Sequence, residues 1–148
     1  MLWYEMASSR LQEMLPLRYR LPLRFKYQNL CKTLEPEMFI ISGFVKTNDL
    51  FIDVGANYGI YSYYFRNTFR KIEAFEPIAW VSAELSCLGI PNIQVHNLAL
   101  SSKNSNSDIH IPLIKGREIS QTATLERQDL PCIIQNVKTA TLDSFNLK

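Results

Sequence analysis

A short apolar segment that leads directly into a double-glycine turn constrains the fold of this chain most. Residues 49–59 read DLFIDVGANYG, with a nearly continuous hydrophobic run over positions 50–54. Such runs are typical of parallel strands that are covered on both faces. Gly55 and Gly59 lack a Cβ, which allows a tight turn and close approach of a ligand. Because residues 60–69 then follow a helical pattern, we expect exposed N–H groups at the strand-to-helix junction, where the helix dipole favours an anion such as a carboxylate.

A second predicted strand ends in an acidic residue. Residues 71–77 read KIEAFEP, and Glu76 follows Gly55 by 21 residues. An acid at that distance, at the carboxyl end of the neighbouring strand, can accept both hydroxyls of an adenosine ribose. Pro77 cannot donate a backbone hydrogen bond, so it ends the strand and turns the chain towards the next helix. The two segments together predict a nucleoside site formed by the glycine turn and Glu76.

The spacing of the glycines indicates which kind of nucleotide ligand fits. Dinucleotide-binding folds normally carry Gly-x-Gly-x-x-Gly, whose middle glycine lets the pyrophosphate approach the backbone. Here the turn has only Gly55 and Gly59, and Asp53 precedes it. A negative residue beside such a turn suits a ligand that has a cationic amino group and no pyrophosphate, and S-adenosylmethionine is one. The spacing disfavours the alternative, a nicotinamide-dependent oxidoreductase.

These motifs resemble those of a known enzyme family. Residues 51–59 look like the first motif of the FkbM family of S-adenosylmethionine-dependent methyltransferases, and residues 74–77 look like its second motif. Residues 34–38, 97–101 and 140–145 look like its lead-in, the end of its third strand and its late Thr-Leu-Asp signature. The resemblance implies an α/β, Rossmann-like class I methyltransferase fold, with S-adenosyl-L-methionine as the cofactor. It also implies O-methylation of a sugar or of another hydroxyl-bearing small molecule or glycan.

The turn and the resemblance together give a set of expected cofactor-binding residues. We expect Tyr58 to cover the methionine moiety, Asn97 to bind the adenine amino group and Ala99 to pack against the adenine ring. His96 is expected to be a hydrogen-bonded structural residue. The sequence identifies no catalytic base and no metal site. The expected cofactor-binding residues are Asp53, Gly55, Ala56, Asn57, Tyr58, Gly59, Glu76, Pro77, Asn97 and Ala99.

The resemblance also predicts that the fold is incomplete. Family members carry a Lys-x-Asp-x-Glu-Gly segment on their fourth strand, soon after the Thr-Leu-Asp signature, whereas this sequence reaches Lys148 without one. We therefore expect the first three parallel strands with their crossover helices, followed by a β-hairpin insertion. The middle strand of the complete sheet would then be an exposed edge, which favours self-association or pairing with a missing C-terminal half. The alternative to an enzyme is a truncated, non-catalytic cofactor-binding remnant or a partner-dependent module.

Residues 1–34 are expected to form a basic N-terminal helical leader, and residues 35–148 to form the domain. The leader carries six basic residues against Glu5 and Glu13. Pro16 and Pro22 prevent a continuous amphipathic helix, so we expect a broken helix whose apolar side packs on the domain. Contact with an anionic membrane surface or with a charged glycan is the alternative.

The next segments are expected to alternate between helices and strands. A helix is predicted over residues 37–45, crossover helices over residues 60–67 and 80–88, and a third strand over residues 92–95. Short links between these strands and helices favour a parallel sheet with right-handed crossovers.

The pattern changes after residue 100. Residues 101–108 are predicted to be a polar turn region. The apolar side chains from Ile109 to Leu113 then alternate with His110 and Pro112, which predicts a strand in an inserted hairpin. Its partner strand is expected at residues 122–125 or at residues 133–137.

Composition is that of an ordinary globular domain. The chain has 148 residues, of which 47% are hydrophobic and 20% charged, and a formal net charge of +2. A domain of this length buries about 70% of its unfolded surface, so independent folding is possible. The three cysteines are widely spaced and are expected to be reduced thiols, which together with the lack of a signal peptide predicts a cytoplasmic protein. No apolar run approaches the ~20 residues of a membrane-spanning helix, and no nucleic-acid partner is expected.

Overall fold

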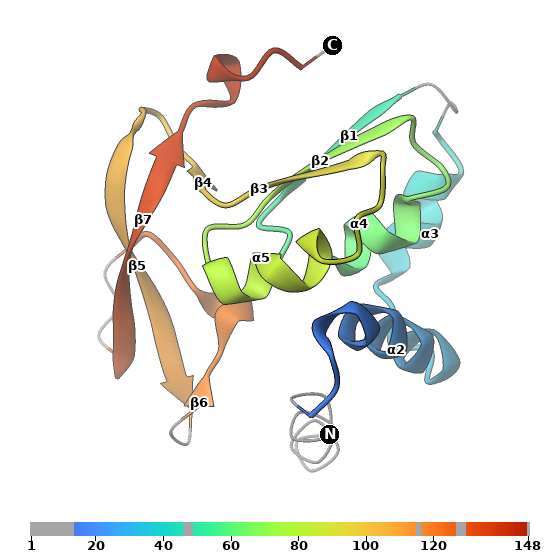
Figure 1. Cartoon of the computed structure of the whole chain (residues 1–148), viewed down its shortest axis with the longest axis horizontal. Helices are drawn as coiled ribbons and strands as arrows, with labels where there is room; N and C mark the ends of the chain where they lie inside the picture. Colours follow the sequence, from blue (N-terminus) through green and yellow to red (C-terminus); the bar gives the residue numbers. More distant parts are fainter. Residues whose placement is uncertain (1–13, 46–48, 115–116, 127–129, 148) are drawn as a thin grey trace.

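The first three strands form a parallel sheet in the order β1-β2-β3 (Figure 1). The computed structural model describes residues 14–45, 49–114, 117–126 and 130–147. The three strands are β1 (Leu50–Val54), β2 (Lys71–Phe75) and β3 (Ile93–His96). Their register places Phe51 beside Ile72. The structure thus confirms the predicted α/β arrangement with three parallel strands, the third shifted by one residue.

Two crossover helices cover one face of this sheet (Figure 1). α4 spans Ile60–Phe65 and α5 spans Ala79–Ser86, so both are shorter than the sequence predicts. After Phe65 the chain leaves the helix in a turn, where the Phe65 carbonyl accepts the Thr68 amide at 2.9 Å and the Phe69 amide at 3.2 Å. The side chain of Asn92 donates to the carbonyl of Phe69 (3.0 Å), which holds this turn against the start of β3.

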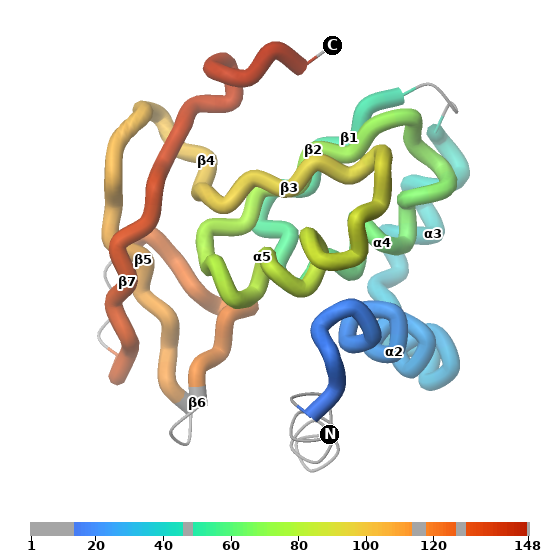
Figure 2. Tube along the Cα trace, in the orientation of Figure 1, coloured from blue at the N-terminus to red at the C-terminus, as the bar shows by residue number. Residues whose placement is uncertain are grey.

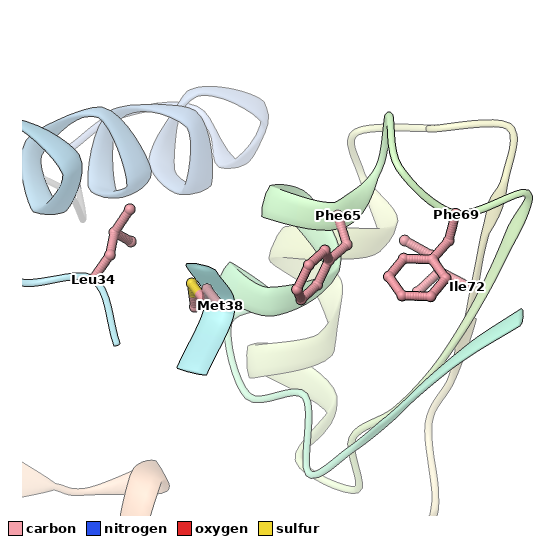
Figure 3. Close-up of a cluster of buried hydrophobic side chains, with 5 residues drawn as sticks. All are labelled: Leu34, Met38, Phe65, Phe69 and Ile72. Atoms are coloured by element: carbon pink, nitrogen blue, oxygen red, sulfur yellow. The ribbon is translucent and has the colours of Figure 1, made fainter. Parts of the chain in front are cut away.

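The main hydrophobic core joins α3 to α4 and β2. α3 spans Pro36–Ser42, shorter than the predicted 37–45. The buried members of this core are Leu34, Met38, Phe65, Phe69 and Ile72 (Figure 3). The ring of Phe51 in β1 lies 5.0 Å from the rings of both Phe65 and Phe69. Each such burial contributes roughly 1.5 to 3 kcal/mol. The core therefore fixes β1 against α4, and with them the turn that connects the two.

The described part of the predicted leader contains one continuous helix, α2 (Leu17–Leu30), and Pro22 lies inside it. The prediction that Pro22 breaks the helix is therefore wrong, whereas Pro16 does mark its start. A proline inside a helix costs about 3 kcal/mol. Tertiary contacts offset this cost, because Leu21 is completely buried and Arg24 forms an ion pair with Glu84 of α5 at 2.8 Å. The part of the predicted leader at residues 1–13 lies outside the described residues.

α2 packs on the outer side of the crossover helices, so that α4 and α5 lie between it and the sheet (Figure 1). Leu21 belongs to a buried cluster with Ala56, Ala74 and Leu85. The predicted packing of the apolar side of the leader on the domain is confirmed for this helix. The contact reaches Ala56, which lies in the glycine turn itself.

A second sheet, in the order β4-β7-β5-β6, stands beside the carboxyl ends of the first three strands (Figure 1). It consists of β4 (Ala99–Leu100), β5 (Ser105–Ile114), β6 (Arg117–Glu118) and β7 (Cys132–Ala140). β5 and β7 are antiparallel, so the predicted partner at residues 133–137 is confirmed. The other candidate segment, residues 122–125, contributes one isolated bridge, between His110 and Thr124.

The predicted polar turn at residues 101–108 is wrong in its second half, because β5 already begins at Ser105. Cross-strand polar contacts stabilise this part of the strand in place of apolar packing. The hydroxyls of Ser105 and Thr139 lie 3.0 Å apart, and the Asn136 side chain donates to Asp108 at 2.9 Å. A polar strand of this kind has no apolar alternation by which the sequence could reveal it.

The two faces of the first sheet are covered differently. Phe51 and Asp53 of β1 face the helices, whereas Val54 is 61% exposed. On that second face Phe145, which follows β7, packs against Phe75 with ring centroids 5.1 Å apart. Figure 2 shows the end of the chain on the side of the sheet opposite to α4 and α5. In the described part of the chain no strand pairs with the outer edge of β1, which matches the expected exposed edge.

Candidate functional site

The glycine turn after β1 is held by the end of β2. The amides of Gly55 and Ala56 both donate to the carbonyl of Phe75, at 2.9 and 3.0 Å. The amide of Asn57 donates to Oε2 of Glu76 at 2.8 Å. Gly55, Asn57 and Gly59 have φ angles of 71°, 48° and 84°, all in the left-handed region that favours glycine. The turn is therefore a tight, left-handed path whose amides point back into the protein.

This geometry corrects one expectation from the sequence. The sequence predicted exposed N–H groups at the strand-to-helix junction, but the amides of Gly55, Ala56 and Asn57 all donate within the chain. The reason is the parallel register, which places Phe75 opposite Val54 and so brings the Phe75 carbonyl beside the turn. These three amides are not available to a ligand carboxylate.

The two glycines meet different constraints. A Cβ on Gly59 would lie 2.8 Å from Cδ2 of Leu85, whose side chain is buried. A Cβ on Gly55 would meet nothing within 4 Å. Gly59 is thus required for packing against α5 as well as for its φ angle. Gly55 is required for its φ angle alone, and it borders open space.

Glu76 lies directly after β2 and is only 6% exposed. Its Oε1 accepts the Ile78 amide at 2.9 Å, and its Oε2 accepts the Asn57 amide at 2.8 Å. A carboxylate has about four acceptor sites, so two bonds leave room for two more donors. Burial raises the pKa of Glu76 above its ordinary value, the two amides oppose this shift by favouring the charged form, and the nearby Asp53 adds to the increase.

A cavity of about 150 Å³ lies between this acid and the second sheet. One wall comes from the turn and the end of β2, and the other comes from β5 and from η1, a short 3₁₀ helix at Ser120–Thr122. The lining residues are Gly55, Asn57, Glu76, Pro77, Ile109, Ser120, Gln121 and Ala123. The structure therefore brings four of the expected residues together. It adds Ile109 of β5 and three residues at η1, which the sequence did not predict as site residues because neither segment carries a binding motif.

Asp53 lies beneath the turn and does not line the cavity. Its Oδ2 accepts the hydroxyl of Ser62 at 2.6 Å and the Ser62 amide at 3.1 Å. Ser62 is in the first turn of α4, whose amides have no partner within the helix. Burial raises the pKa of Asp53, and the two bonds from Ser62 oppose that shift. In the described structure, Asp53 anchors the start of α4.

Tyr58 is packed between three elements. The guanidinium carbon of Arg24 lies 3.8 Å from the centre of its ring, and the ring of Trp80 in α5 lies 6.1 Å away. Burial raises the pKa of Tyr58, while a hydrogen bond with Ser120 and the charge of Arg24 oppose the shift. Tyr58 therefore stands beside the cavity, in contact with α2, α5 and η1.

The other expected residues lie around the strand ends. Asn97 Nδ2 donates to the carbonyls of Glu76 and Pro77, both at 2.9 Å, and so braces the turn after β2. Ala99 pairs with Thr139 in the second sheet and does not line the cavity. His96 Nε2 lies 2.6 Å from Oε2 of Glu73, which agrees with the structural role expected for it.

A larger cavity, of about 370 Å³, lies apart from this chemistry, between the end of α2 and α3. It is lined by Asn29, Lys32, Leu34 and Phe39, and it contains none of the residues expected from the sequence. The smaller cavity is the better candidate site because a buried carboxylate with remaining acceptor sites faces it.

Comparison of the chain with protein-family models, with curated proteins and with solved structures gave no match. Among the described residues, no group of three or more His, Cys, Asp or Glu is placed to hold a metal ion. None of the described helices is both long and apolar enough to cross a membrane. Glu76 and polar groups such as Ser120 and Gln121 line the cavity, and they suit a ligand with hydroxyl donors.

Alanine substitutions should separate the roles of the two glycines. Gly59→Ala should lower the free energy of unfolding by roughly 2 to 4 kcal/mol, because it combines left-handed strain with a clash against Leu85. Gly55→Ala should lower it by only about 1 kcal/mol, from strain alone. Urea unfolding of both variants measures the difference. Equal losses would contradict the geometry of the turn.

Proposed function

We propose that the chain is the cofactor-binding part of an S-adenosylmethionine-dependent methyltransferase of the FkbM type, with a Rossmann-like class I fold. The observation that supports this most is Glu76, a buried carboxylate at the carboxyl end of β2 that faces a cavity beside the glycine turn. In parallel α/β folds, ligands bind at the carboxyl ends of the strands. The resemblance of residues 51–59 and 74–77 to the family motifs supports the same assignment.

The ribose of the cofactor would bind at Glu76. Its two hydroxyls would donate to the acceptor sites that remain after the Ile78 and Asn57 amides have bonded. The adenine amino group would donate towards Asn97, whose Nδ2 is already used by backbone carbonyls and whose oxygen is the atom that can accept. The methionine part would extend towards Gly55, where the structure has open space.

The size of the cavity bears on how the cofactor enters. Pockets for small molecules usually measure roughly 300 to 1,000 Å³, whereas the cavity at Glu76 measures about 150 Å³. The space accommodates the ribose part but not a whole cofactor with its acceptor. Binding would therefore require η1, which carries Ser120 and Gln121, to move away from the turn.

The proposed reaction is the methylation of a hydroxyl on a sugar, another small molecule or a glycan. The hydroxyl oxygen attacks the methyl carbon in line with the sulfur, the carbon–sulfur bond breaks, and the hydroxyl proton passes to a base. Glu76 would be occupied by the ribose, so it does not serve as that base. The role of this chain in the proposal is to bind and orient the sulfonium cofactor.

Glu76→Gln tests the proposal directly. Loss of the charged acceptor should weaken binding of S-adenosylmethionine by about 2 to 4 kcal/mol, because hydrogen bonds to a charged group are the stronger kind. Isothermal titration calorimetry measures the affinity. Glu37→Gln, which changes an exposed glutamate in α3, is the matched control and should leave it unchanged. No binding by the folded wild-type chain, or equal affinity in the Glu76 variant, would sink the proposal.

The same contact predicts how binding depends on pH. Ribose hydroxyls donate to the ionised carboxylate, so cofactor binding favours the charged form of Glu76 and should lower its pKa. Because burial raises that pKa in the free protein, affinity should begin to fall while the pH is still above the ordinary range of a glutamate. Titrations at a series of pH values should show this fall for the wild type and a flatter profile for Glu76→Gln. An affinity that rises with acidity would contradict it.

A second candidate function is a module that pairs with another chain through β1. The specific observation is the outer edge of β1, with which no described strand pairs, together with Val54, a β-branched residue that is 61% exposed. Edges of this kind are templates for pairing with another strand. A cofactor-binding remnant of this sort would have no catalytic activity of its own.

Val54→Lys tests the pairing. A charge at this edge should raise the monomer fraction, because lysines on edge strands oppose edge-to-edge association. Sedimentation velocity at several protein concentrations measures the fraction. Leu30→Lys on α2 is the control, since it makes the same kind of change at a side chain that is 79% exposed and lies away from the edge. A wild-type chain that stays monomeric at all concentrations, or an equal shift in both variants, would argue against pairing at β1.

A further inference from the structure

We propose that Arg24 is a positioning residue of the cofactor site, and that helix α2 holds the glycine turn in its binding conformation through the ring of Tyr58. The proposal rests on the proposed function and names residues that lie outside its motifs. Arg24 is 52 positions before Glu76 and does not line the cavity. Its influence would pass through a series of direct contacts between α2, α5, the turn and η1.

The first contact fixes Arg24 itself. Its Nη1 donates to Oε2 of Glu84 at 2.8 Å, and Glu84 is only 4% exposed on the buried side of α5. Arg20 also approaches this carboxylate, at 3.7 Å. Leu21, completely buried, lies between the two arginines in sequence and packs against Leu85. These apolar and charged contacts help to dock α2 on α5, and they set the position of the Arg24 guanidinium.

The second contact passes from Arg24 to the turn. The guanidinium carbon is 3.8 Å from the centre of the Tyr58 ring, within the range of a cation–π interaction. Tyr58 lies between Asn57 and Gly59, both with left-handed φ angles. A non-glycine residue in this conformation persists only when its surroundings fix it. The ring of Tyr58, held by Arg24 and beside Trp80, supplies part of that constraint.

The third contact comes from the opposite wall of the cavity. The hydroxyl of Ser120 in η1 donates to Oδ1 of Asn57 at 3.1 Å. Until η1 moves away for binding, it holds Asn57 by its side chain, whereas α2 holds it through its neighbour Tyr58. Its amide in turn donates to Oε2 of Glu76, the proposed ribose acceptor. The series from Glu84 through Arg24, Tyr58 and Asn57 ends at the atom that would contact the cofactor.

The consequence is that affinity for the cofactor depends on α2. When Arg24 no longer holds the ring, Tyr58 and Asn57 sample other conformations, and the Asn57 amide leaves Glu76. Only a fraction of the molecules is then competent to bind the cofactor. The apparent affinity falls in proportion to that fraction. The effect appears in the dissociation constant although no group that touches the cofactor has changed.

The test compares Arg24→Gln with Arg18→Gln, which changes an exposed arginine of the same helix. Arg24→Gln should weaken binding of S-adenosylmethionine about tenfold, the size expected for one cation–π contact. Arg18→Gln should leave it unchanged. Arg24→Lys keeps the ion pair with Glu84 but not the planar guanidinium, so its affinity should lie between those of the Arg24→Gln and Arg18→Gln variants. It replaces Arg24→Gln in the test if that variant does not fold. Equal affinities of the Arg24 and Arg18 variants would overturn the proposal.

A double-mutant cycle identifies the route of the effect. If Arg24 acts through Tyr58, the double variant Arg24→Gln/Tyr58→Leu should bind the cofactor no more weakly than Tyr58→Leu alone. Additive losses would show that Arg24 acts by another route and would overturn the proposal. Urea unfolding of each variant reports stability separately from affinity.

A spectroscopic measurement keeps this proposal distinct from the proposed function. In two-dimensional ¹H–¹⁵N NMR spectra of the protein without cofactor, Arg24→Gln should shift the amide signal of Asn57 and leave that of Ile78, which also donates to Glu76, in place. If the wild type binds no S-adenosylmethionine but the Asn57 signal shifts as expected, the proposed function fails and the positioning role of Arg24 stands. An unmoved Asn57 signal would overturn the positioning role whatever the protein binds.

Discussion

The hydrogen bond from the Asn57 amide to Oε2 of Glu76 is the interaction on which the candidate site depends. It ties the turn after β1 to the end of β2. Hydrogen bonds to charged groups contribute roughly 1.5 to 3 kcal/mol, and burial of Glu76 protects this one from water. The bond requires a left-handed Asn57, and Gly55 and Gly59 let the backbone enter and leave that conformation. The two glycines thus serve to present an amide to an acid, and Gly59 also admits the buried side chain of Leu85.

The sequence predicted those parts of the fold that local signals specify. β1 matched an apolar run, and the turn matched its two glycines, because apolar runs and missing Cβ atoms act over a few residues. The position of Glu76 also followed from the sequence, since the length of one strand–helix unit determines which residue reaches the end of the neighbouring strand. The carboxylate does face a cavity beside the turn. Membership of the FkbM family and S-adenosylmethionine as ligand remain proposals.

Contacts between distant segments were not predictable in the same way. Ser120 forms a hydrogen bond with Asn57, which lies 63 positions earlier in the sequence. No local pattern in residues 119–123 predicts that they form a wall of the cavity. Pro22 was expected to break a helix that Leu21 and Arg24 hold together through contacts with α5. Local propensity was outweighed by tertiary packing there. The amides of the turn illustrate the same limit. A glycine motif predicts a tight turn, but it does not show whether the amides of that turn donate to a ligand or to the carbonyl of a neighbouring strand.

The edge of β1 that no described strand covers and the cavity both reach the carboxyl end of β1. The two candidate functions therefore need not exclude each other. Parallel strands present their carboxyl ends at one edge of the sheet. A strand that paired with β1 in parallel would therefore end beside Gly55, opposite the place that Glu76 occupies on β2. Its last residues would border the open space at Gly55, where the methionine part of the cofactor and the acceptor would lie. Pairing at β1 would cover Val54 and bring further side chains to the reacting atoms, which is where the proposed reaction requires a base.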